Sequence, residues 1–322
     1  MRSPCSSFAA AALLLALSLQ PAVLAKSSLN ILIGNDDGFG SANIRALFDS
    51  LLQAGHSPII AAPVDNKSGT DGARQTPRVL DHEGEYAFAH KGDPAVGHES
   101  PRENADERIW YINSYPASAV QVGLDQLAPI AFNGSLPDLV VTGPNEGSNL
   151  GLSYLVSGTY GAARYAVQQG VPAIAFSAGN DTHRPYTDIK GEDDQARTYA
   201  RLATKFIERL TEGGKPYLPV NTGLNVNFPS ATTRDCSPGT ETFILTRLLG
   251  TIDPDPDTCT CGQSHNRGGC KLPIELDLNR KSELGCAITV SVFEPSKWSP
   301  DASETQQTVV LERLKDLLTC VP

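Results

Sequence analysis

Short apolar runs alternate along the chain with segments in which apolar residues recur at helical spacing. The runs 29–34 and 58–62 predict strands, and the spacing over 44–52 predicts a helix between them that ends at Gly55. A strand, a helix and a strand in this order form a βαβ unit with a parallel sheet. The pattern continues, with strands expected at 109–113, 138–142, 171–177, 224–228, 243–248 and 288–293, and helices starting at 116, 159, 196 and 303.

Two segments interrupt this alternation. Residues 80–108 are hydrophilic, which predicts a surface insertion or an exposed hairpin that adds nothing to the core. Residues 143–151 are rich in glycine and asparagine and predict a loop after the strand 138–142. We expect a main α/β domain over 26–230 and a smaller cysteine-containing C-terminal region over 231–322 that completes or extends its core.

The first 25 residues have the composition of a secretory signal peptide. Arg2 precedes an apolar stretch over 8–19, and Val23-Leu24-Ala25 suits cleavage after Ala25. That stretch is too short to cross a bilayer, and the alternative, a buried N-terminal helix, lacks polar alternation. The sequence therefore predicts a protein secreted to the extracellular space or cell wall, with no membrane partner.

The acidic balance of the chain limits its partners. The formal charge is −10, and removal of Arg2 with the signal leaves 25 basic and 36 acidic residues, a charge of 25 − 36 = −11. Such a surface repels nucleic-acid polymers. A small phosphorylated substrate remains compatible, provided that a metal or backbone N–H groups meet its phosphate.

The cysteines beyond Cys5 lie in the last third of the chain. An even number in an exported chain predicts three disulfides, and sequence alone leaves 15 pairings open. A zinc site is the alternative, but no C-x-x-C pair or suitably spaced histidines support it. The six residues are Cys236, Cys259, Cys261, Cys270, Cys286 and Cys320.

Polar loops follow the strands that we place in the sheet. Asp36 and Asp37 follow the first strand, Ser68 lies in the loop after the second, and Asn145 follows the central one. The carboxyl ends of parallel strands share one edge, where ligands bind. Adjacent carboxylates repel each other by roughly a kcal/mol, and a cation relieves that repulsion. Oxygen donors favour Mg²⁺ or Mn²⁺, with Ca²⁺ a further candidate, and no histidine is needed to complete the site.

The predicted helix over 159–169 opens with a second candidate site. Ser157, Gly158 and Thr159 precede or begin this helix, whose free N–H groups and dipole suit a phosphate. Ordinary helix capping is the alternative explanation for the serine and threonine. A dinucleotide-binding turn after the first strand is disfavoured, because Asn43 occupies the third glycine position and two acids lie where a pyrophosphate would sit.

These motifs, in this order, resemble the SurE survival-protein family of metal-dependent acid phosphatases and nucleotidases. The resemblance covers roughly 29–230. The segments that carry it are Asn35-Asp36-Asp37-Gly38, Ser68-Gly69, Pro116-Ala117, 138–141, Gly143 with Asn145, Ser157-Gly158-Thr159, 170–177 and 224–229. Three features depart from the family pattern: Pro144 replaces an aliphatic residue, the turn 38–41 is short, and 80–108 is unusually long.

The resemblance implies a Rossmann-like three-layer core with a mainly parallel sheet. It also implies homodimers or higher oligomers and hydrolysis of phosphate monoesters, notably nucleoside monophosphates, by metal-activated water. A secreted nucleotide- or phosphate-binding protein without turnover is the alternative function. The implied metal ligands are Asp36, Asp37, Ser68 and Asn145, with Asp36 and Asp37 also catalytic; to phosphate binding we assign Asn35, Gly69, Ser157, Gly158 and Thr159.

Three asparagines match the glycosylation pattern N-x-S/T. They are Asn66, Asn133 and Asn180. A glycan on Asn66 would crowd the proposed ligand Ser68, so we expect Asn66 to remain unmodified.

Overall fold

The computed structural model describes residues 28–99, 106–179, 182–250, 255–263, 269–295 and 299–321. The predicted signal peptide and the glycosylation position Asn180 lie outside these residues. None of the helices in the described ranges is long and apolar enough to cross a membrane.

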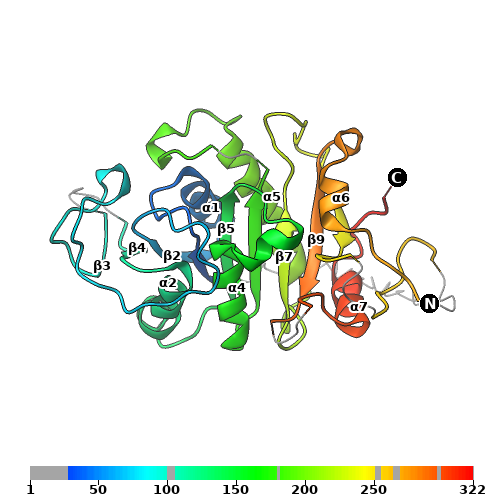
Figure 1. Ribbon diagram of the computed structural model, residues 1–322, viewed down its shortest axis with the longest axis horizontal. Coiled ribbons are helices and arrows are strands. Elements are labelled where there is room, and N and C mark those ends of the chain that lie inside the picture. The colour runs from blue at the N-terminus through cyan, green and yellow to red at the C-terminus, as the bar shows by residue number, and fades with distance from the viewer. Residues whose placement is uncertain are drawn as a thin grey trace, which may run out of the picture.

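In the described part of the chain, nine strands form a single sheet. Their order is β3-β4-β2-β1-β5-β6-β7-β9-β8, and the strands labelled in Figure 1 follow this order from left to right. The six strands from β4 to β7 are mutually parallel, β3 and β9 run antiparallel to their neighbours β4 and β7, and β8 is parallel to β9. The strands are β1 (Asn30–Gly34), β2 (Ser57–Pro63), β3 (Val96–Gly97), β4 (Ile109–Ile112), β5 (Leu139–Glu146), β6 (Ala173–Ala178), β7 (Gly223–Asn227), β8 (Thr242–Thr246) and β9 (Ala287–Phe293).

Helices cover both faces of the sheet, so the predicted three-layer α/β fold is confirmed (Figure 1). Helices α1 and α5 pack on one face and α2 and α4 on the other, each over its own buried apolar cluster. The α-helices are α1 (Ala42–Gln53), α2 (Pro116–Val122), α3 (Ala128–Ala131), α4 (Gly158–Gln168), α5 (Gln195–Thr211), α6 (Glu275–Asn279) and α7 (Glu304–Arg313). A π-helical turn, η2 (Gly123–Leu127), and short 3₁₀ turns, η1 (Glu85–Ala87), η3 (Gly151–Leu155), η4 (Tyr186–Asp188) and η5 (Ser282–Leu284), complete the set.

The order of the parallel strands reverses at β1. From β1 the chain moves outward to β2 and β4, and then returns to the other side of β1 as β5, followed by β6 and β7. Ligands of open α/β sheets bind outside the carboxyl ends of the strands at such a reversal. The fold therefore directs attention to the loops that leave β1 and β5.

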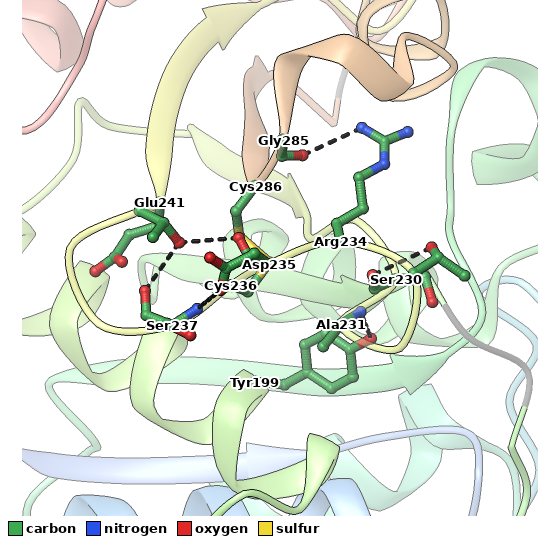
Figure 2. Close-up of a disulfide and its surroundings, with 12 residues drawn as sticks. Tyr199, Ser230, Ala231, Arg234, Asp235, Cys236, Ser237, Glu241, Gly285 and Cys286 are labelled. Atoms are coloured by element: carbon green, nitrogen blue, oxygen red, sulfur yellow. Dashed lines mark hydrogen bonds between the residues drawn. A yellow bond between two sulfur atoms is a disulfide. The ribbon is translucent and has the colours of Figure 1, made fainter.

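The region after residue 230 joins the same sheet through β8 and β9. The prediction of three disulfides is confirmed, with the pairs Cys236–Cys286, Cys259–Cys270 and Cys261–Cys320. The first pair ties the loop after β7 to the start of β9, as Figure 2 shows.

Further contacts hold the loop after β7 in place. The Tyr199 hydroxyl accepts a hydrogen bond from the Ala231 N–H at 2.9 Å, and Arg234 donates to the Gly285 carbonyl at 3.2 Å (Figure 2).

Two predictions about loops were wrong. Part of the hydrophilic stretch 80–108 enters the core, because Leu80, Phe88 and Ala89 are buried, whereas the antiparallel pairing of β3 with β4 agrees with the hairpin alternative. The predicted loop 143–151 begins too early, since β5 continues through Glu146 after a shift in its pairing register with β6. Both errors concern segments next to the candidate site.

Candidate metal and phosphate site

Asp36 leaves β1 and contacts the end of β5 through a shared hydroxyl. Thr159 Oγ lies 2.5 Å from Asp36 Oδ1 and 3.3 Å from Asn145 Oδ1. Both oxygens therefore lie within reach of one atom, although 109 positions separate the two residues in the sequence, 145 − 36. All three side chains are buried, Thr159 completely.

Asp37 lies beside Asp36 but faces a different neighbour. Its Oδ2 accepts a hydrogen bond from the Glu146 N–H at 3.0 Å, and the residue is only 1% exposed. Burial raises the pKa of Asp37 well above its usual range, and the nearby Asp36 and Glu146 carboxylates raise it further. Burial also raises the pKa of Asp36, against the hydrogen bonds from Thr159 and Gly158.

The amino-terminal end of α4 faces Asp36. Ser157 caps the helix by accepting a hydrogen bond from the Tyr160 N–H at 3.0 Å, so the capping interpretation describes this serine. A side chain at Gly158 would meet Asp36, with a Cβ 2.8 Å from Asp36 Cβ and 2.9 Å from Asp36 Oδ2. The backbone N–H groups of Gly158 and Thr159 interact with the Asp36 carboxylate, which shows that the helix end already stabilises negative charge here.

The loop that carries Ser68 approaches the site through its backbone. The Lys67 N–H donates to the Asp36 carbonyl at 2.6 Å. Ser68 and Gly69 are exposed, and within the described ranges no hydrogen bond joins the Ser68 side chain to either aspartate. The structure thus brings Ser68 and Gly69 to the mouth of the site but leaves them outside its buried cluster.

Asn35 shapes the turn after β1. Its Nδ2 donates to the Gly38 carbonyl at 2.8 Å and lies 3.3 Å from Ser41 Oγ, while its Oδ1 is buried and has no hydrogen-bond partner among the residues that the structure describes. The side-chain NH₂ group of Asn35 therefore stabilises the turn that carries the two aspartates.

Three residues that sequence reasoning missed border the site. Glu146 ends β5, His183 lies in the loop after β6, and Glu85 belongs to the insertion. His183 hydrogen-bonds Glu146 through Nδ1 and Glu85 Oε1 through Nε2, the latter at 2.5 Å. Burial raises the pKa of Glu146 to about 7. The position of His183 after a parallel strand places it at the same edge of the sheet, a signal that the expectation of an all-oxygen site did not use.

The donor set fits a hard divalent cation. Asp36, Asp37 and Asn145 present carboxylate and amide oxygens at the strand reversal, and no lysine or arginine of the described chain forms an ion pair with either aspartate. Buried carboxylates without a cationic side chain are stabilised by a metal ion, and Mg²⁺ and Mn²⁺ favour such oxygens. A neighbouring group at this edge, Asp37, Glu146 and His183, also has the spacing of a metal-binding cluster.

The fold places this protein among the Rossmann-like α/β proteins, with an acidic site at the strand reversal. Comparison of its sequence with those of known proteins identifies the family. The profile of the family described as Survival protein SurE matches residues 31–250. The chain is 33% identical over 300 residues to an acid phosphatase of Yarrowia lipolytica (strain CLIB 122 / E 150), covering 86% of this chain and 82% of the relative. The chain belongs to the SurE family.

Bacterial relatives match a shorter part of the chain. A 5′-nucleotidase SurE of Polaromonas naphthalenivorans (strain CJ2) is 33% identical over 202 residues, which cover 63% of this chain and 66% of that protein. The crystal structure of the SurE protein from Aquifex aeolicus superposes with a TM-score of 0.51 and 21% identity, covering 89% of this chain and 99% of that one. This likeness shows a shared fold.

Proposed function

We propose that this protein is a divalent-metal-dependent phosphatase that cleaves phosphate monoesters, with nucleoside monophosphates among its substrates. It is a phosphoric monoester hydrolase by family, since its relatives include an acid phosphatase and 5′-nucleotidases. A small phosphorylated substrate also agrees with the acidic chain, which repels nucleic-acid polymers.

The observation that carries the proposal is the convergence of Asp36, Asp37 and Asn145 at the strand reversal. These residues would hold the ion, and Ser68 would join them from the loop at the mouth. A bound Mg²⁺ or Mn²⁺ would supply charge neutralisation at the phosphoryl group and orient an attacking water.

The chain itself would supply orientation and proton transfer. The helix end at Gly158 and Thr159 places N–H groups beside Asp36, where they favour negative charge on a phosphate. One of the two aspartates would accept the proton of the attacking water. Direct attack by a carboxylate would instead leave an aspartyl-phosphate, and trapping such a species during turnover would contradict the water mechanism.

A panel of phosphate esters, assayed with each divalent ion before and after chelation, tests the proposal. We expect chelation to stop phosphate release and Mn²⁺ or Mg²⁺ to restore it. Asp36→Asn and Asp37→Asn should each reduce metal-stimulated release to background while the circular dichroism spectrum stays unchanged. Asp125→Asn, at an exposed position of η2, is the control and should retain activity.

Two results would contradict this function. Full turnover in Asp36→Asn or Asp37→Asn would remove these acids from the mechanism. Binding of a nucleotide without any phosphate release, whichever ion is present, would favour the passive binding protein.

Secretion, glycosylation and oligomer formation belong to the same proposal. The mature chain would begin at Lys26, carry no glycan on Asn66 and form a homodimer or a higher oligomer. Mass spectrometry of the exported protein tests the first two, and sedimentation measures the third. A sugar on Asn66 would count against Ser68 as a ligand.

A further inference from the structure

We propose that Asp37, Glu146 and His183 form a second cation site that takes a borderline divalent transition metal such as Zn²⁺. It would lie beside the oxygen site of Asp36 and Asn145, with Asp37 shared between the two ions. The inference rests on the proposed function, because that function assigns Asp37 to the first ion.

Three separate strand ends bring the ligands together. Asp37 follows β1, Glu146 ends β5 and His183 lies in the loop after β6. One ligand atom from each of the three lies within 4.8 Å of the other two. Two donors at metal–ligand distances of about 2.2 Å lie at most about 4.4 Å apart, so this spacing brings the three atoms close to a common ion, with small side-chain shifts completing the site.

A buried oxygen without a partner points independently to a ligand. The Glu146 side chain is only 3% exposed, and its Oε1 forms no hydrogen bond within the described chain. Its other oxygen contacts His183 Nδ1. Buried carboxylate oxygens are normally paired, so an unpaired one beside a histidine and an aspartate indicates a cation ligand.

The surroundings of His183 are those of a metal-binding histidine. Its Nδ1 faces Glu146, and its Nε2 lies 2.5 Å from Glu85 Oε1. Glu85 is itself held by a hydrogen bond from the Asn66 N–H at 2.9 Å, on the loop that carries Ser68. Metal-bound histidines usually donate their second ring N–H to a carboxylate in this way, which fixes the tautomer and the ring orientation.

The charges and donor types favour a transition ion over Mg²⁺ here. Four carboxylates, those of Asp36, Asp37, Glu85 and Glu146, interact around one histidine, which offsets at most one negative charge. An imidazole nitrogen combined with carboxylate oxygens suits Zn²⁺ or Mn²⁺, whereas Mg²⁺ prefers oxygen alone. The two sites should therefore differ in their metal preference.

Metal counting on the full-length protein tests the site. Metal-free protein is dialysed against Mn²⁺ together with Zn²⁺ or Co²⁺, and bound ions of both kinds are counted by elemental analysis, with the visible spectrum of Co²⁺ reporting nitrogen ligation. We expect two ions per wild-type chain and one per His183→Ala chain. His90→Ala is the matched control, because His90 also contacts a carboxylate, Glu83, at 2.9 Å, but neither residue belongs to the proposed ligand set.

A second variant separates the ligand from its support. Glu85→Gln should keep two ions but bind one of them about 10- to 100-fold more weakly, as expected for loss of a carboxylate behind a ligating histidine. His183 is 35% exposed, so its replacement by alanine should leave the thermal unfolding temperature nearly unchanged.

The outcomes distinguish this site from the proposed function. One ion in wild type that His183→Ala retains and Asp36→Asn loses would overturn the second site and leave the proposed function intact. Two ions in both wild type and His183→Ala would also overturn it. One ion that His183→Ala loses and Asp36→Asn retains would support this site and contradict the oxygen site.

Discussion

At the residue scale, the two adjacent aspartates point to different partners. Asp36 interacts with Thr159 and the end of α4, whereas Asp37 interacts with Glu146 at the end of β5. Consecutive residues after a strand project to different sides, so one dipeptide can contribute to two neighbouring sets of ligands. This divergence makes a shared role for Asp37 in the proposed second site geometrically reasonable.

Thr159 is a positioning residue between Asp36 and Asn145. Thr159→Val keeps the shape but removes the hydroxyl, so both oxygens lose their common neighbour. A hydrogen bond to a charged group contributes about 1.5–3 kcal/mol, so the metal concentration for half-maximal activity should rise about tenfold or more. Titration of phosphate release against Mn²⁺ measures this. Thr159→Ser should restore the wild-type value; equal metal requirements in all three proteins would contradict the role.

Some residues of the site could be predicted from the sequence and others could not. Asn145 was identifiable because it follows an apolar strand on the expected edge of the sheet. Glu146 and His183 carry no local signal, since a glutamate and a loop histidine are ordinary surface residues. Only the burial of the Glu146 side chain and its contact with His183 distinguish them.

At the element scale, the start of α4 packs directly on the end of β1. Glycine at position 158 permits this approach, because any Cβ would overlap Asp36. The start of helix α4 was predictable from its capping serine. That its first turn faces the Asp36 carboxylate was not.

Gly158→Ala tests that packing. Alanine normally favours a helix, yet here its Cβ would displace Asp36 and lower kcat/KM on the order of 10- to 100-fold, because small displacements of reacting groups reduce rates strongly. Steady-state kinetics with a phosphate ester measures the change. Gln168→Ala, at the exposed far end of the same helix, is the control. Wild-type kcat/KM in Gly158→Ala would show that the close packing of α4 against Asp36 is not needed for turnover.

The insertion is the element that the sequence described least well. Its polar composition predicted an exposed segment, but three of its apolar side chains are buried. Its acid Glu85 contacts His183. Tyr86 in this segment adopts a positive φ of 59°, an uncommon conformation for a non-glycine residue. The segment therefore belongs to the wall of the site.

At the scale of the whole molecule, the C-terminal region is part of the same sheet and is joined by a buried acid to the segment between β5 and α4. Glu275 in α6 accepts hydrogen bonds from the Gly151 N–H at 2.9 Å and from the Ser291 hydroxyl at 2.8 Å. Gly151 starts the turn between β5 and α4, and Ser291 lies on β9. The carboxyl group thus connects three segments that are distant in sequence.

Glu275 should make stability depend on pH. Burial raises its pKa to about 8, above the value of about 4.3 in an unfolded chain. Between these two pKa values the folded state holds a proton that the unfolded chain releases. The contribution of this proton to the free energy of unfolding is therefore greatest below about pH 4 and declines as the pH rises to about 8. The unfolding temperature of wild type should fall relative to Glu275→Gln between about pH 5 and about pH 8. Parallel curves for the two proteins would contradict the raised pKa.

The disulfides should contribute to stability according to the loops that they close. Cys236–Cys286 spans 50 residues and Cys259–Cys270 spans 11. In the chain-entropy account, replacing the first pair by serines should cost about 1 kcal/mol more than replacing the second. Denaturant unfolding of the two double variants measures the difference. A larger loss from the shorter loop would show that contacts such as that of Arg234 with Gly285, rather than chain entropy, decide the order.

The sequence by itself determined the βαβ pattern, the paired acids after the first strand and the family. These features depend on residues close together in the chain, whose hydrophobic period and turn chemistry are visible locally. The tertiary structure decided which strand ends meet, because the crossover from β4 back to β5 brings Glu146 beside Asp37 and the pairing of β6 with β5 brings His183 there. It also decided which cysteines pair and which polar residues are buried, since both depend on contacts between segments that are far apart in sequence.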